Sequence, residues 1–135
     1  MATDAMPSVE AQSGANSGLR PLTLKKVLVV TGNIETPMAT VTIVVNGQHE
    51  TKQHHGRGPV DALFKAINEA VGQYASGVEM TSYSVRSRGK GTGAQAQVKV
   101  CVEKGGKSYS GSYQHIDTLV ASAYAYVDAL KRIGT

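Results

Sequence analysis

One short run of the sequence has the residue types of an anion-binding turn. Residues 56–61 read Gly-Arg-Gly-Pro-Val-Asp and follow the pair His54-His55. Glycines let the backbone come close to a ligand, and a proline after them suits the first turn of a helix. The free N–H groups at such a helix start attract a carboxylate or a phosphate. The run therefore predicts either a turn that binds an anion or a turn that only changes the direction of the chain.

A second glycine-rich run, residues 89–93, reads Gly-Lys-Gly-Thr-Gly. A phosphate-binding P-loop ends in Gly-Lys-Ser/Thr directly before a helix, and here an alternating strand pattern follows instead. We therefore expect a flexible hairpin at this position.

Residues that could hold a metal or act as nucleophiles do not form a recognisable set. His54 and His55 are adjacent, so in a strand they would point to opposite faces, and His49 and His115 have no cysteine or carboxylate at ligand spacing. Cys101 lies in an alternating strand, where we expect a buried, unreactive thiol. Without a Ser-His-Asp order or paired carboxylates, we expect no metal, no cofactor and no catalysis by this chain alone.

Composition indicates one domain, and the single cysteine fits the reducing cytoplasm in which we expect the chain to work. The chain has 135 residues, of which 41% are hydrophobic, with one Phe, six Tyr and no Trp, so Val, Ala, Ile and Leu must build the core. A single cysteine excludes an internal disulfide. The net charge of +4 is a weak signal for nucleic acid. No run reaches about 18 apolar residues and no basic region precedes an apolar one, so we expect neither a membrane span nor a signal peptide.

The first half of the ordered chain predicts three strands and a helix. Strand patterns cover residues 24–30, 38–45 and 48–55, the last of them polar and exposed. Asn46-Gly47 supplies a type I′ hairpin turn between the second and the third. A helix of about four turns begins at Pro59. Its apolar face comprises Val60, Leu63, Phe64, Ile67, Val71 and Tyr74.

The second half predicts the same plan. Strand patterns cover residues 78–88, 94–103 and 108–115, and Asp117 is a suitable N-cap for a final helix. One face of that helix comprises Val120, Ala123, Tyr124, Val127 and Leu130. We therefore predict an α+β fold of two βββα units packed together, each an antiparallel three-stranded sheet covered by its helix, which suggests an internal duplication.

The domain organisation follows from these patterns. Residues 1–21 are rich in Ala, Ser and Gly without an apolar period, so we expect a disordered tail or linker. Residues 22–135 form the folded domain, with one unit at 22–76 and the other at 77–133. A unit of this size is marginal alone, so we expect the two units to share a core and the chains to pair.

Four stretches resemble the regulatory domain of the 2-isopropylmalate synthases. The run Gly56–Ala62 is similar to the GxGPVDA motif of that family, and Phe64–Asn68 continues the match. Ala94–Val100 resembles its AQ-containing strand, and Asp117–Leu130 resembles its closing helix. The resemblance covers about residues 22–133.

The resemblance implies a function. The full enzymes condense acetyl-CoA with a 2-keto acid in an N-terminal TIM barrel, and their C-terminal domain dimerises and binds leucine as feedback inhibitor. Citramalate synthases share the domain and respond to isoleucine. The effector lies near the dimer interface, and small residues with apolar walls suit a branched side chain. The effector positions carried onto this chain are Gly56, Arg57, Gly58, Pro59, Val60, Asp61, Met80, Tyr83, Ser87, Ala94, Ala96 and Thr118.

The chain also departs from the family pattern. Arg57 stands where a small polar residue such as Asn is frequent, and Gly93 stands where an Asp commonly precedes the AQ pair. The catalytic barrel is absent from these residues, so we expect an excised domain or a free-standing homologue that acts on a barrel partner. Two alternatives remain. One is a dimerisation domain that binds no effector, and the other is a nucleic-acid module using Arg86, Arg88, Lys90, Lys99 and Lys104.

Overall fold

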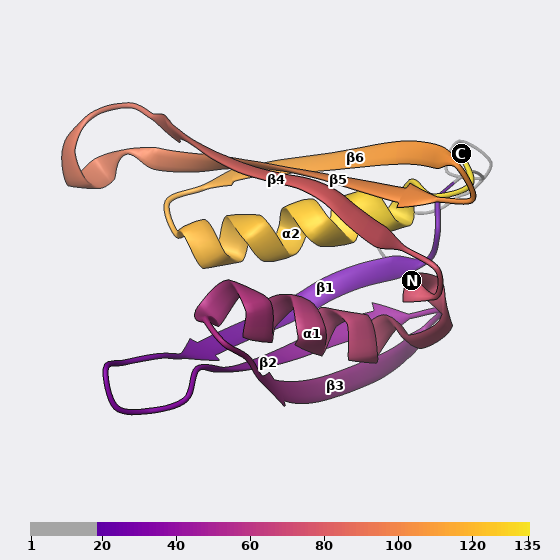
Figure 1. The fold of residues 1–135 in the computed structure, drawn as a ribbon, viewed down its shortest axis with the longest axis horizontal. Helices are drawn as coiled ribbons and strands as arrows, with labels where there is room; N and C mark the ends of the chain where they lie inside the picture. The colour runs from indigo at the N-terminus through magenta and orange to yellow at the C-terminus, as the bar shows by residue number, and fades with distance from the viewer. Residues whose placement is uncertain (1–18) are drawn as a thin grey trace.

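The computed structural model describes residues 19–135, which form two three-stranded antiparallel sheets and two helices (Figure 1). The tail predicted at 1–21 lies outside the described residues over 1–18. The first unit contains strands β1 (Leu22–Val30), β2 (Met38–Val45) and β3 (Gln48–His55) and helix α1 (Pro59–Val71).

The second unit repeats this order after a short 3₁₀ turn, η2 (Gly72–Ala75), which contains Tyr74. It contains β4 (Glu79–Arg88), the 3₁₀ turn η3 (Gly91–Gly93), β5 (Gln95–Lys104), β6 (Lys107–His115) and α2 (Thr118–Lys131). The predicted α+β class and the βββα plan, repeated twice, are confirmed.

The two units share details that an internal duplication explains. Each sheet has its second strand in the centre, in the orders β1-β2-β3 and β4-β5-β6. The register of each first strand shifts near its start, between Leu24 and Lys26 in β1 and between Met80 and Ser82 in β4. A bulge at matching places in both edge strands is a feature that a duplicated unit would inherit.

Tight turns join the second and third strands of both sheets. Asn46 and Gly47 have φ of 50° and 86°, which is the positive-φ pair that a type I′ turn requires. Gly105 and Gly106, with φ of 61° and 80°, close the hairpin between β5 and β6 in the same way. The Asn-Gly turn predicted from the sequence is confirmed.

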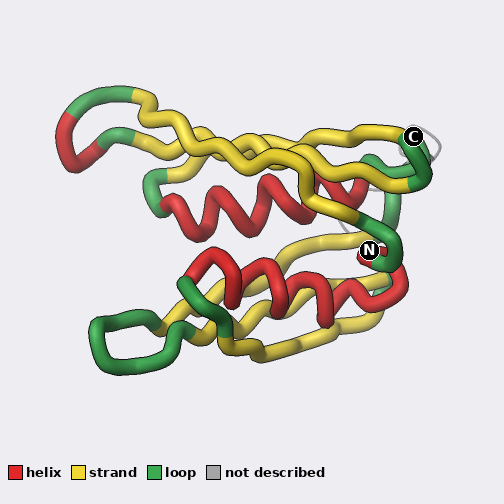
Figure 2. The backbone as a smooth tube through the Cα atoms, in the orientation of Figure 1, coloured by secondary structure: helices red, strands yellow, loops and turns green. Residues whose placement is uncertain are grey.

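Both helices lie between the two sheets (Figure 2). Helix α1 packs on β2 and β3, and α2 packs on β5 and β6 while also contacting α1 and β1. The buried apolar residues of both units therefore form one continuous core. Neither unit could bury its helix as fully alone, because each helix contacts elements of the other unit.

Helix α2 is buried on more sides than its sequence pattern predicted. Val120 and Tyr124, expected in the core, are only half-buried, whereas Ser122 and Tyr126 are buried. The predicted face was therefore partly wrong. The reason is that α2 has a sheet on one side and β1 with α1 on the other, and a helix enclosed in this way has no single buried stripe.

Glycine at 111 allows α2 to lie directly on β6. A methyl group built on Gly111 would lie 2.9 Å from the carbonyl carbon of Asp128, which is closer than real side chains approach backbone. Gly111 does not have a positive φ, so its backbone conformation does not require glycine. The close approach of the helix does.

One end of the molecule gathers most of the connecting loops. Both helices start there, and the β1–β2 loop and the β4–β5 hairpin project beyond them (Figure 1). At the opposite end lie the C-terminus, the start of β1 and the two tight hairpins (Figure 1). We call the first end the loop end.

Cys101 does not have the surroundings predicted for it. Its neighbours Val100 and Val102 are fully buried, so the cysteine points away from the helices and its side chain is partly exposed. The expectation of a buried thiol was wrong, because the strand alternation places residue 101 on the outer face of the sheet. Over residues 19–135, no helix combines the length and the apolar character that crossing a bilayer requires.

Candidate functional site

The run predicted to bind an anion forms the turn between β3 and α1. Gly58 is the N-cap in an extended conformation, with φ −152° and ψ 174°, and Pro59 begins the helix. No side chain caps this helix start. The backbone N–H groups of Val60 and Asp61 are therefore left without a side-chain partner at the positive end of the helix dipole.

The carboxylate of Asp61 connects the two sides of this turn. Its Oδ2 accepts the backbone N–H of Arg57 at 2.9 Å, and Lys65 Nζ lies 3.1 Å away. The Arg57 guanidinium is more distant at 3.8 Å. The backbone hydrogen bond from Arg57, followed by the hydrogen bond from Lys65, lowers the pKa of Asp61. The negative charge of Asp61 is therefore stabilised by groups of the turn and of the first helical turns.

The two glycines of the turn are present for different reasons. A methyl group on Gly56 would lie 2.6 Å from the Cα of Ala62, so only glycine fits this close to the helix backbone. A methyl group on Gly58 would have no heavy atom within 4 Å. The conformation of Gly58 suits any residue, so the open space beside it is available for a ligand.

Strand β4 turns the three predicted residues Met80, Tyr83 and Ser87 toward the helices. Tyr83 lies opposite buried Val100, and Ser87 lies opposite buried Ala96 on β5. The structure thus brings Ser87 and Ala96 together near the loop end. Met80 lies toward the other end of the strand, so the predicted set is spread along β4.

Tyr83 is hydrogen bonded into helix α2. Its Oη lies 2.8 Å from Ser122 Oγ, and Ser122 Oγ donates to the carbonyl oxygen of Thr118 at 2.7 Å. Tyr83 and Thr118, both predicted from the resemblance, are therefore connected through a residue that was not predicted. Ser122 is fully buried and gave no sequence signal beyond a hydroxyl within an alanine-rich helix.

Phe64 joins this group to helix α1. Its ring meets the ring of Tyr83 edge-on, with centroids 5.6 Å apart, and lies 4.9 Å from the ring of Tyr126. The Tyr126 hydroxyl donates to Asn68 Oδ1, and burial raises the pKa of Tyr126 to about 12. The sequence placed Phe64 in the core, but its position beside Tyr83 could not be inferred from periodicity.

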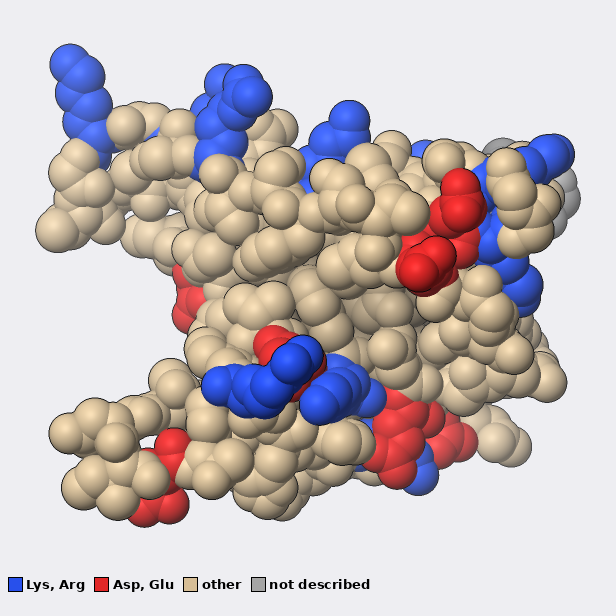
Figure 3. All heavy atoms as spheres, in the orientation of Figure 1, with Lys and Arg blue, Asp and Glu red and all other residues tan. Residues whose placement is uncertain are grey.

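Large apolar side chains are exposed around the same end. Val30, Ile34, Val85 and Ile116 are exposed by 42%, 87%, 47% and 59%. Ile34 is in the β1–β2 loop, and Ile116 precedes α2. The molecular surface is hollowed between the projecting β1–β2 loop and the projecting β4–β5 hairpin (Figure 3). These four side chains come from different segments of the chain at the loop end.

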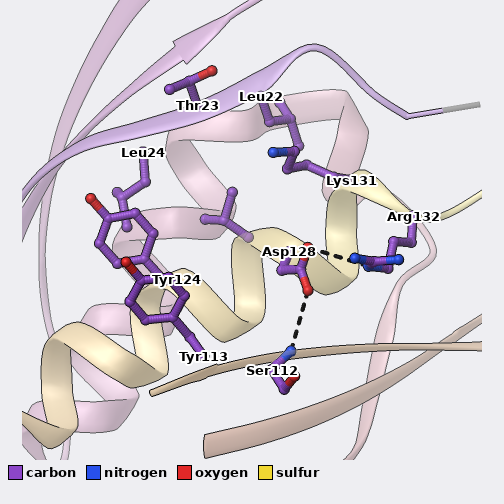
Figure 4. Close-up of a pocket in the computed structure, with 10 residues that line it drawn as sticks. Leu22, Thr23, Leu24, Ser112, Tyr113, Tyr124, Asp128, Lys131 and Arg132 are labelled. Carbon is purple, nitrogen blue, oxygen red and sulfur yellow. Dashed lines mark hydrogen bonds and ion pairs between the residues drawn. The ribbon is translucent and has the colours of Figure 1, made fainter. Parts of the chain in front are cut away.

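A separate cavity of about 360 Å³ lies between β1, β6 and α2 (Figure 4). It is lined by none of the predicted residues. The rings of Tyr113 and Tyr124 are stacked in it at 4.5 Å, and Asp128 accepts hydrogen bonds from the Ser112 backbone and from Arg132. Because none of the predicted effector residues lines this cavity, the loop end remains the candidate site.

The fold and the site together define a class of protein. It is an α+β domain of two βββα units, with an uncapped helix start and an apolar surface at one end. Residues 3–134 match the family described as the LeuA allosteric (dimerisation) domain, and the chain belongs to that family. The resemblance predicted from the four motifs is confirmed.

Individual relatives agree with the family assignment. The chain is 42% identical over 108 residues to a 2-isopropylmalate synthase of Chromobacterium violaceum, covering 80% of this chain and 20% of that protein. It is 39% identical over 111 residues to one of a Synechococcus strain, covering 82% and 20%. It is 34% identical over 128 residues to one of Acetivibrio thermocellus, covering 94% and 25%. The chain thus spans about a fifth to a quarter of the length of these relatives.

Proposed function

We propose that this chain is a regulatory module for a 2-isopropylmalate synthase-type enzyme, and that it binds leucine at the loop end and pairs with a second copy. The observation that carries the proposal is the match of residues 3–134 to a domain described as allosteric and dimerising. In this proposal the condensation of acetyl-CoA with a 2-keto acid belongs to a TIM barrel outside these residues. The chain works in the cytoplasm without a cofactor.

The chemistry of the loop end suits a small amino acid. The uncapped N–H groups of Val60 and Asp61 can receive a carboxylate, which the helix dipole favours. The space beside Gly58 is open. On the second sheet, Tyr83 and Ala96 present an aromatic ring and a small apolar side chain on the face that carries buried Val98 and Val100. A branched aliphatic side chain fits such surroundings better than a charged one.

The exposed apolar residues support pairing with a second copy. Val30, Ile34, Val85 and Ile116 flank the same end as the candidate site, and burying them against a copy of themselves would remove apolar area from water. The second copy then also covers the open side of the effector site.

The experiment is isothermal titration calorimetry of the chain against leucine, isoleucine and valine, with light scattering for the oligomeric state. We expect saturable binding of leucine to a dimer, and saturable binding of isoleucine alone would instead assign the citramalate synthase type. Gly58→Val should weaken leucine binding by at least about tenfold, because it fills the open space. Ser110→Val, exposed on β6, is the control.

A dimerisation domain without an effector is the second candidate, favoured by the departures at Arg57 and Gly93. Flat titrations with all three amino acids, together with a stable dimer, would overturn the leucine proposal in its favour.

A further inference from the structure

The hydrogen bonds that join Tyr83 to helix α2 have a fixed direction. A backbone carbonyl can only accept, so the 2.7 Å bond between Ser122 Oγ and the Thr118 oxygen uses the one proton of the serine hydroxyl. The 2.8 Å bond between Ser122 and Tyr83 must then use the proton of the tyrosine. Toward any ligand, the Tyr83 oxygen therefore offers lone pairs and no proton.

The surroundings hold this direction in place. Ser122 is completely buried, so its hydroxyl has no access to water. If the Tyr83 hydroxyl turned its proton elsewhere, the Ser122 oxygen would lose its donor in the interior, which is unfavourable. The edge-on contact with Phe64 fixes the tyrosine ring itself. Tyr83 remains half-buried, so one side of it is not enclosed.

We propose that Tyr83 accepts a hydrogen bond from the ammonium group of the ligand, and that Ser122 is the positioning residue that makes it an acceptor. This inference rests on the proposed function and adds a specificity to it. The site distinguishes an α-amino acid from the 2-keto acid of the same carbon skeleton. An ammonium group donates to the Tyr83 oxygen, whereas a keto oxygen would face it with lone pairs against lone pairs.

This selectivity suits a feedback module. An enzyme that works on 2-keto acids is surrounded by compounds with the carboxylate and the branched chain of the amino acid, so those two groups cannot separate effector from substrate-like molecules. The group at the α-carbon is what differs. A tyrosine oxygen that can only accept a hydrogen bond distinguishes an ammonium group from a keto group at the α-carbon.

The test compares leucine with 4-methyl-2-oxopentanoate by calorimetry on the wild type and on Ser122→Ala. For the wild type we expect leucine to bind about 10- to 100-fold more tightly, the range for one hydrogen bond to a charged group. In Ser122→Ala the Tyr83 proton is released and can be donated to the keto oxygen. Leucine affinity should fall, keto-acid affinity should rise, and the ratio should drop to within about threefold.

A purely structural role for Ser122 would give a different result. It would weaken both ligands in proportion and leave their ratio unchanged, and that outcome overturns the inference. Ser110→Ala, an exposed serine on β6, is the matched control and should keep the wild-type ratio. If Ser122→Ala does not fold, Tyr83→Phe decides the question, because it should weaken leucine about tenfold and leave the keto acid unchanged.

The two proposals can fail separately. If the wild type binds no leucine, the proposed function is wrong, and this inference falls with it. If leucine binds but the keto acid binds equally well, the site is an effector site and only the role given to Tyr83 and Ser122 is overturned.

Discussion

At the scale of single residues, Gly56 and Gly58 stand two positions apart in one turn and serve different purposes. We expect Gly56→Ala to lower the free energy of unfolding by about 1–3 kcal/mol, because its methyl group would press on the backbone of Ala62. Gly58→Ala should change it by less than about 0.5 kcal/mol, since nothing lies near its Cβ. Urea denaturation of both variants measures this. Equal losses would show that Gly58 is also needed for the fold.

Asp61 gives the turn a dependence on pH. Its pKa is lowered in the folded protein, first by the Arg57 backbone hydrogen bond and then by Lys65, from the ordinary value of 3.8. A carboxyl group with a depressed folded pKa stabilises the fold above its unfolded pKa and loses that effect as the pH falls through the folded value. We expect wild type to have a higher urea midpoint than Asp61→Asn at pH 7.

That advantage should shrink as the pH falls below about 3.8, when the carboxyl of the unfolded chain and then that of the folded chain is protonated. Glu69→Gln, at an exposed position of α1, is the control. A midpoint difference between wild type and Asp61→Asn that is the same at pH 7 and pH 2.5 would contradict this account.

At the scale of elements, the two helices begin in different ways. Helix α2 is capped by Asp117, whose Oδ1 accepts the N–H of Leu119 at 2.8 Å and that of Val120 at 3.2 Å, whereas α1 has no side-chain cap. We expect Asp117→Ala to reduce the free energy of unfolding by about 1 kcal/mol and Asp117→Asn to retain most of it. Thermal denaturation separates the two. Equal losses in both variants would indicate that charge matters more than capping.

Much of the element structure could be predicted because local chemistry determines it. Asn46-Gly47 can form a tight hairpin by itself, and the alternation of residues 94–103 assigns the faces of a strand without knowledge of the rest of the fold. The burial of α2 could not be predicted in the same way. Ser122 and Tyr126 are buried by strands and a helix from elsewhere in the chain, and a one-sided periodicity does not contain that information.

The candidate site shows the same division. The turn at Gly56–Asp61 is a continuous run, so its residues could be found by motif, and the registers confirm that Ser87 and Ala96 are neighbours. Ser122 and Phe64 are 58 residues apart in the sequence and reach Tyr83 from two different helices. Only packing in three dimensions places them there, so their roles had to come from the structure.

At the scale of the whole molecule, the placement of apolar surface predicts how chains pair. Val85 and Ser84 are adjacent on β4 but face opposite ways, because Val85 lies opposite buried Val98 and Ser84 lies opposite exposed Lys99. A charge at 85 would enter the surface that we expect a second copy to cover, and a charge at 84 would stay in water. We expect Val85→Asp to raise the dimer dissociation constant at least about tenfold, since an unpaired buried charge is strongly unfavourable.

Ser84→Asp adds the same charge to the same strand and should leave the dimer intact, which makes it a matched control for Val85→Asp. Light scattering across a concentration series measures both variants, with circular dichroism to verify the fold. A dimer that survives Val85→Asp would place the interface away from the loop end. The candidate effector site would then have to function without a second chain beside it. Loss of the dimer in Ser84→Asp alone would point instead to the outer face of the second sheet, where Ser84 and Arg86 of β4 lie beside Lys99 of β5.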